Sequence, residues 1–237
     1  MRLPLIAALA ASLLSACVEV TSAPTGSTTG PSAGPVPNRV TSANAVANFQ
    51  AAVSRVEPAA ERLCRERAAA ANCDFLIRID PNPSAPPNAF QSLDRNGRPV
   101  LTFTRALIAD ARNQDEIAFV VGHESAHHIE QHIARQRQSA AAGAIVGGLI
   151  ASVAGADQAT ANQISRIGAD VGARSYSRNH ELEADALGTI ITARAGYDPL
   201  RGAAFFTRIP DPGDRFLGTH PPNSERIDVV RRTVAGL

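Results

Sequence analysis

Two histidines spaced four residues apart, with a glutamate directly after the first, constrain this chain more than any other feature. They are His123, Glu124 and His127. Because residues i and i+4 lie on one face of an α-helix, both imidazoles can reach a single Zn²⁺ at about 2.0–2.1 Å. Glu124 is then placed to take a proton from a water that the metal activates. The spacing predicts a helical zinc site, although such histidines can also be ordinary buried polar groups.

The residues before this motif predict the helix that carries it. Asn113 is a favourable N-cap, and Glu116 three residues later completes a capping box. Ile117 and Val120 recur at helical spacing, which indicates a buried face. We therefore expect one helix over residues 114–138, with the motif near its middle.

A catalytic zinc ion needs a third protein ligand and an open position. A third histidine of the metzincin kind is excluded, because the positions that this pattern requires hold Glu130 and Ile133. His128 and His132 form a second pair four residues apart, but on a different face of the helix from the first pair. We expect these two histidines to be exposed to solvent.

A stronger candidate lies downstream, where Glu181 and Asp185 share one face of a predicted helix. Glu181 could complete a site of two histidines and one glutamate. Asp185, one turn away, could orient a ligand histidine through a hydrogen bond. The alternative is an exposed acidic helix with ordinary charge pairing.

Together these motifs resemble the gluzincin metallopeptidases of the HtpX and CAAX-prenyl-protease group, and in particular its soluble periplasmic branch. The likeness covers roughly residues 45–235. The further segments that carry it are 87–90, 115–122, 195–199, 219–222 and 225–227. Residues 91–99 depart from the family pattern, since they are polar and turn-like where relatives often carry an apolar, glycine-rich run.

The resemblance implies a site with one Zn²⁺ per chain. The implied zinc ligands are His123, His127 and Glu181. It also implies that Glu124 is the general base and that Asp185 supports a ligand histidine from behind.

Two more residues acquire roles only through the resemblance. His220 matches a histidine that approaches the metal in relatives, where it closes the resting site or stabilises the oxyanion. Arg226 matches a basic position close to the site. The alternative for His220 is a structural role in the proline-rich turn at residues 219–222.

The first 16 residues predict export from the cytoplasm. They carry one positive charge and a short apolar run followed by small residues, which is typical of a secretory signal and too short to span a membrane. Residues 14–17 also resemble a bacterial lipobox. That resemblance implies cleavage before Cys17, a lipid anchor on Cys17 and, with Val18 following, the periplasmic side of the outer membrane. The alternative is an ordinary signal peptide with an incidental cysteine.

The remaining chain predicts a tether and one domain. Residues 17–40 are rich in Thr, Ser, Gly and Pro and read as a flexible tether, which leaves residues 41–237 as the metallopeptidase domain. In an exported protein Cys64 and Cys73 are expected to form a disulfide, with two buried thiols as the alternative. A formal net charge of +1 and few aromatic residues give no indication of nucleic-acid binding.

The predicted fold is α+β and mostly helical, a zincin-like metallopeptidase domain with a small β-sheet beside the active-site helix. Strands are expected near 74–80, 89–93 and 99–104. Helices are expected near 43–70, 105–111, 114–138, 158–193, 199–208 and 224–234. Residues 139–156 are uncharged and rich in Ala and Gly, which favours a helical hairpin or lid over a membrane span.

The predicted function is that of a zinc endopeptidase of the cell envelope, acting on misfolded or unassembled proteins. Its expected partners are protein or peptide substrates, the membrane through Cys17, and the machinery that assembles outer-membrane proteins. The alternative is a metal-bearing chaperone or assembly factor with little proteolysis. Glu124 favours the enzyme, because a binding protein has no need of a general base.

Overall fold

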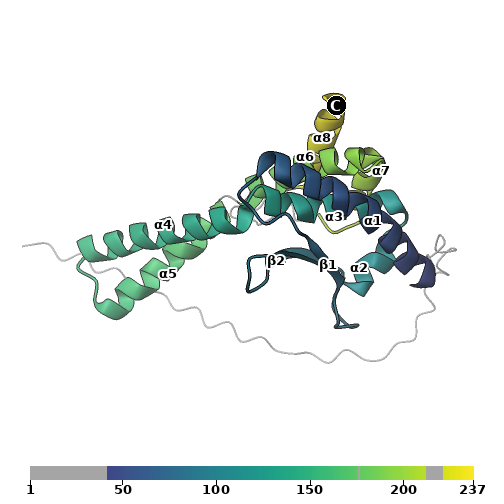
Figure 1. The fold of residues 1–237 in the computed structure, drawn as a ribbon. Coiled ribbons are helices and arrows are strands. Elements are labelled where there is room, and N and C mark those ends of the chain that lie inside the picture. The colour runs from purple at the N-terminus through teal and green to yellow at the C-terminus, as the bar shows by residue number, and fades with distance from the viewer. Residues whose placement is uncertain (1–41, 176, 212–220) are drawn as a thin grey trace, which may run out of the picture. The chain divides into compact units, whose positions relative to one another are not determined.

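The fold is α+β and mostly helical, as the sequence predicts. It comes from a computed structural model that describes residues 42–175, 177–211 and 221–237. Figure 1 shows the arrangement of its elements. The helices are α1 (Ser42–Arg67), α2 (Arg105–Asp110), α3 (Gln114–Ile129), α4 (His132–Val153), α5 (Gln158–Ser175), α6 (Ser177–Arg194), α7 (Pro199–Ala203), the 3-10 helix η1 (Ala204–Thr207) and α8 (Asn223–Ala235).

A three-stranded sheet lies beside α3. Its strands are β1 (Leu76–Ile79), β2 (Ala89–Leu93) and β3 (Pro99–Phe103), in the order β1-β3-β2. The central strand β3 is buried along its whole length, and it pairs parallel with β1 and antiparallel with β2. Gly97, at a φ of 79°, allows the tight turn between β2 and β3. The edge strand β2 is the one that borders the candidate site.

The first helix, α1, contacts both the sheet and α3, the helix that carries the two motif histidines. α1 packs against α3, and the Phe49 ring of α1 lies 5.2 Å from that of Phe103 in β3. Cys64, near the end of α1, is joined by a disulfide to Cys73, and their Cα atoms lie 5.7 Å apart. This bond fixes the loop between α1 and β1, so that both elements share one hydrophobic core.

The single helix expected over residues 114–138 is wrong. α3 ends at Ile129, and α4 begins at His132 after a sharp break. Gln131 causes the break, since it adopts the left-handed conformation with a φ of 55°. A non-glycine residue in this conformation is uncommon and marks a position where the surrounding structure imposes the turn.

Residues 139–156, expected to form a helical hairpin, belong to a hairpin that α4 and α5 form. α4 and α5 lie side by side along their lengths (Figure 1). A Cβ added at Gly143 would collide with the backbone carbonyl of Gly168, so glycine permits the close approach of the two helices. Within the described residues, no helix is long and apolar enough to cross a membrane. The range 158–193, expected as one helix, holds α5 and α6, with residue 176 outside the described part of the chain.

A second pair of glycines brings α6 against α3. A Cβ added at Gly122 would lie 2.9 Å from the carbonyl oxygen of Gly188. A Cβ added at Gly188 would lie 2.9 Å from the backbone nitrogen of His123. This contact places α6 directly beside the first histidine of the motif. α8 also packs against α6.

Candidate active site

The two motif histidines meet on one face of α3. The helix starts as the sequence predicts, because the Asn113 side chain accepts a hydrogen bond from the backbone N–H of Glu116. His123 and His127 lie one turn apart, with their Nε2 atoms 3.0 Å from each other. Both side chains are largely buried. Their spacing on the helix therefore aims two nitrogen atoms at the same point.

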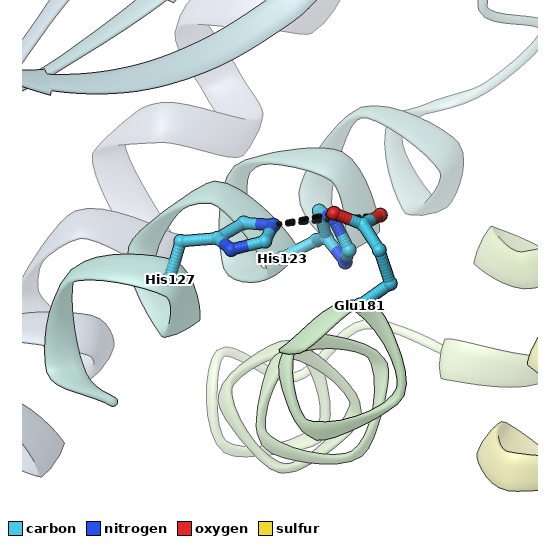
Figure 2. Close-up of side chains that lie close together, drawn as sticks. All are labelled: His123, His127 and Glu181. Carbon is cyan, nitrogen blue, oxygen red and sulfur yellow. Dashed lines mark hydrogen bonds and ion pairs between the residues drawn. The ribbon is translucent and has the colours of Figure 1, made fainter. Parts of the chain in front are cut away.

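Glu181 of α6 faces the same point, as Figure 2 shows. Its Oε2 atom lies 3.6 Å from Nε2 of His123, and its Oε1 atom lies 3.4 Å from Nε2 of His127. Atoms bound to zinc at about 2.0–2.1 Å in a tetrahedron lie roughly 3.3 Å apart. The spacing and chemistry of these three side chains fit a zinc ion.

The carboxylate of Asp185 lies behind His123. Its Oδ1 atom is 2.9 Å from Nδ1 of His123, and the Asp185 side chain is completely buried. Burial disfavours the charged imidazole, but the carboxylates of Asp185 and Glu181 outweigh burial and raise the pKa of His123 to about 10. The surroundings therefore favour positive charge at this point, as a site for a cation requires.

Arg226 of α8 holds Asp185 in place. Its Nε and Nη2 atoms each donate a hydrogen bond of 2.7 Å to one carboxylate oxygen of Asp185. The guanidinium also lies 3.9 Å over the ring of Phe206 and 3.6 Å from Glu181. Arg226 is buried, so this two-pronged pair is shielded from solvent.

Glu124 lines the same cavity as the three candidate ligands. The cavity has a volume of about 770 Å³ and runs along β2, with Phe90 and Gln91 in its wall. Burial, opposed by the charge of His123, raises the pKa of Glu124 to about 7. A carboxylate with a pKa near neutrality can both accept and return a proton. Phe205 and Phe206 contribute apolar surface to the wall of the cavity.

The expectation that His128 and His132 are exposed is wrong, because both are buried. His128 turns away from the site and bonds through Nε2 to the carbonyl oxygen of Asn72 at 2.7 Å. His132 turns toward the site, and its Nδ1 atom lies 2.8 Å from Nδ1 of His127. Burial lowers the pKa of His132 to about 4, which favours the neutral ring.

His132 and Glu183 are site neighbours that the spacing rules miss. Within a continuous helix, His132 would lie roughly 140° around the axis from His127. Glu183 stands between Glu181 and Asp185 in the sequence and so falls on a different face of α6. The improbable backbone of Gln131 is the feature that brings His132 back, and nothing in the sequence signals it.

Two residues named from the sequence, Cys17 and His220, lie outside the described residues. The remaining candidates for the metal site and its catalytic groups gather within one region. His123, His127, Glu181, Asp185 and Arg226 form a contiguous group, and Glu124 borders the same cavity.

The chain is similar to metallopeptidases from bacteria and mitochondria. It is 30% identical over 163 residues to the mitochondrial metalloendopeptidase OMA1 of Saccharomyces cerevisiae, covering 64% of this chain and 45% of the yeast protein. It is 33% identical over 135 residues to a Vibrio cholerae protein whose name assigns it provisionally to the beta-barrel assembly-enhancing proteases, covering 51% of this chain and 28% of that protein. It is 28% identical over 141 residues to the beta-barrel assembly-enhancing protease of Escherichia coli K12, covering 54% and 29%.

The chain spans less than half the length of each of these relatives. A family model covers far more of the chain itself. The model of peptidase family M48 matches residues 51–234, a range that includes every described candidate for the site. The expected metallopeptidase family is thereby confirmed, and the chain belongs to peptidase family M48, whose members depend on a metal ion.

Proposed function

We propose that this protein is a zinc-dependent endopeptidase with one Zn²⁺ per chain, held by His123, His127 and Glu181. The observation that carries the proposal is the convergence of the three side chains. The Nε2 atoms of His123 and His127 lie 3.0 Å apart, and the two carboxylate oxygens of Glu181 lie 3.6 Å and 3.4 Å from them, close to the separation of roughly 3.3 Å expected between ligands of a tetrahedral zinc ion. Membership of a metallopeptidase family supports the same activity. The three side chains line a cavity that would give a substrate access to a metal bound there.

Each of the protein's own groups has a separate task in the reaction. Bound zinc would act as a Lewis acid toward the scissile carbonyl and the attacking water. Glu124 accepts the proton of that water and returns it to the departing amine, which its pKa of about 7 permits. Asp185 accepts the Nδ1 proton of His123, which would leave the Nε2 lone pair of His123 free to hold a metal ion. Arg226 keeps Asp185 in that position.

The substrate peptide is proposed to bind in an extended conformation along β2. In the described part of the chain, β2 pairs with β3 alone, so its other edge can accept an added strand. Phe90 and Leu93 of β2 are partly exposed and offer apolar contacts. Unfolded segments present both an extended backbone and apolar side chains, which supports misfolded or unassembled proteins as the substrate class.

The proposed location is the periplasmic face of the bacterial outer membrane. It rests on the sequence of the first 40 residues, read as a signal peptide (1–16), a lipidated Cys17 and a tether (17–40) before the catalytic domain (41–237). The names of two bacterial relatives refer to beta-barrel assembly, which supports a link to the assembly of outer-membrane proteins. Mass spectrometry of membrane-extracted protein should find an acylated N-terminal Cys17, and an unmodified soluble N-terminus would refute the anchor.

His220 is proposed to control access to the metal, on the basis of its place in the motif at residues 219–222. If it closes the resting site, His220→Ala raises the cleavage of a loose substrate such as casein. If it stabilises the oxyanion, the same substitution lowers kcat by about 10²–10³-fold. An unchanged kcat at full zinc occupancy would remove His220 from the mechanism.

Proteolysis by the Glu124→Gln variant tests the proposed function. The substitution removes the base but no ligand, so the protein should keep its zinc and lose about 10²–10⁴-fold in kcat on unfolded casein. Cleavage at the wild-type rate would contradict the proposal. The chaperone alternative would instead be favoured if the wild-type protein suppressed aggregation of unfolded proteins but cleaved none of them.

A further inference from the structure

We propose that His132 is a positioning residue, which fixes the orientation and the tautomer of the metal ligand His127 by linking it to the carboxylate of Glu183. The inference rests on the zinc site of the proposed function and adds a residue that the helical motif does not contain. The linked side chains of His127, His132 and Glu183 are called the relay below.

The geometry of the relay is continuous. Nδ1 of His127 lies 2.8 Å from Nδ1 of His132, and Nε2 of His132 lies 3.2 Å from Oε2 of Glu183. Arg135, one turn further along α4, donates hydrogen bonds to both carboxylate oxygens of Glu183. The His132 ring is also stacked on that of His180, with their centroids 4.3 Å apart. His132 is thus held on several sides.

The direction of each hydrogen bond follows from the chemistry of its partners. A carboxylate only accepts, so the proton of His132 must be on Nε2, where it donates to Glu183. A neutral imidazole has one N–H, which leaves Nδ1 of His132 as an acceptor. The close contact with His127 then requires the proton of His127 to be on its Nδ1 atom. The Nε2 atom of His127 is left with a free lone pair, which points at Nε2 of His123 and at Glu181.

The backbone is shaped for this contact. In an uninterrupted helix the two rings could not meet, because His132 comes five positions after His127 and would lie roughly 140° around the helix axis from it. The left-handed Gln131 interrupts the helix, and His132 becomes the first residue of α4. Backbone strain of this kind persists only where neighbouring interactions impose it. The relay supplies such an interaction at this junction.

The test measures zinc affinity rather than activity. Metal-free wild type and variants are titrated with zinc in competition with a chromophoric chelator, and thermal unfolding of the metal-free proteins is recorded in parallel. His132→Leu removes both hydrogen bonds and should weaken zinc binding by about 10–100-fold. His132→Asn retains an acceptor near the position of Nδ1 and should lose less zinc affinity than His132→Leu. The zinc affinity of Glu183→Gln should lie between those of His132→Asn and wild type.

His128→Leu is the matched control, since it removes a buried histidine of the neighbouring helix that bonds to Asn72 rather than to the site. It should lower the unfolding temperature and leave zinc affinity unchanged. Equal weakening by the His128 and His132 substitutions would overturn the proposal, because both would then act through general stability. Wild-type affinity in His132→Leu would overturn it as well.

Two further outcomes are distinguished by the same titration. If His132→Leu does not fold, graded losses in His132→Asn and Glu183→Gln support the relay, and wild-type affinity in both contradicts it. If wild type itself binds no zinc, the proposed function fails, whatever the variants show. If only the proposal for the relay is wrong, the wild-type protein still binds zinc.

Discussion

His123 and His127 occupy equivalent places on one helix, yet they are supported in different ways. His123 contacts a carboxylate directly, and the buried pair of Asp185 and Arg226 forms the His123 support. Nδ1 of His127, on the side away from Glu181, reaches a carboxylate through a second imidazole, and His132, Glu183 and Arg135 form the His127 support. The side chains of Asp185 and Arg226 are 0% and 8% exposed, whereas those of Glu183 and Arg135 are 41% and 40% exposed.

This difference separates two contributions of a supporting charge. When one partner of a buried ion pair is removed, the other charge remains in a region of low dielectric. Removing that partner therefore destabilises the whole fold. An exposed ion pair contributes little to stability because water solvates both charges. We therefore expect the His123 support to couple metal binding to folding. The His127 support should act on metal binding with little effect on the fold.

The largest expected effect comes from breaking the buried pair. Arg226→Met leaves the carboxylate of Asp185 buried without its main partner, which should lower the free energy of unfolding by about 3–5 kcal/mol. Urea denaturation of the metal-free protein measures this loss. Arg231→Met on the same helix is the control, because its pair with Asp228 is exposed and should contribute about 0–1 kcal/mol. Equal losses in the two variants would contradict the role assigned to burial.

A smaller effect is expected when both supports are shifted together. Gly188→Ala adds a Cβ 2.9 Å from the backbone nitrogen of His123, which forces α6 away from α3. Such overpacking should cost about 1–3 kcal/mol of stability and weaken zinc binding, since α6 carries Glu181. Gly148→Ala in the hairpin is the control, because its nearest neighbour is the side chain of Ser165 at 3.1 Å, which can move. Zinc affinity unchanged in Gly188→Ala would show that the helix contact does not position the ligand.

The smallest effect on stability is expected at the exposed end of the His127 support. Arg135→Gln removes the ion pair with Glu183 and should change the free energy of unfolding by no more than about 1 kcal/mol. Zinc affinity should fall slightly, and by less than in His132→Leu, because Glu183 still accepts the hydrogen bond of His132. A stability loss as large as that of Arg226→Met would remove the distinction between the two supports.

The spacing of residues in the sequence predicts the contact of Asp185 with His123 much better than it predicts the relay. His123 and Asp185 each stand four residues from a second candidate, and this spacing alone places each pair on one face of a helix. The relay breaks the same rule twice. His132 follows His127 by five residues, and Glu183 follows Glu181 by two. Periodicity assumes a continuous helix and cannot anticipate the left-handed Gln131.

The fold shows the same limit. The strand at 89–93 is found at those residues, and the turn at Gly97 that follows it is a local signal. The expected helix over 114–138 fails at residue 130, because apolar and helix-favouring residues continue on both sides of the break. The tertiary contacts of His132 decide that boundary, and they lie far away in the sequence, on α6.

The coordination of zinc by His123, His127 and Glu181 is the central claim, and X-ray absorption at the zinc edge tests it most directly. Purified wild type should contain one zinc per chain, with only nitrogen and oxygen neighbours at about 2.0–2.2 Å and the signature of two imidazoles. His127→Ala should lose most of the metal, and the zinc that remains should show one imidazole fewer. Full zinc content with two imidazoles in His127→Ala would contradict the assignment, as would a wild type that binds no zinc.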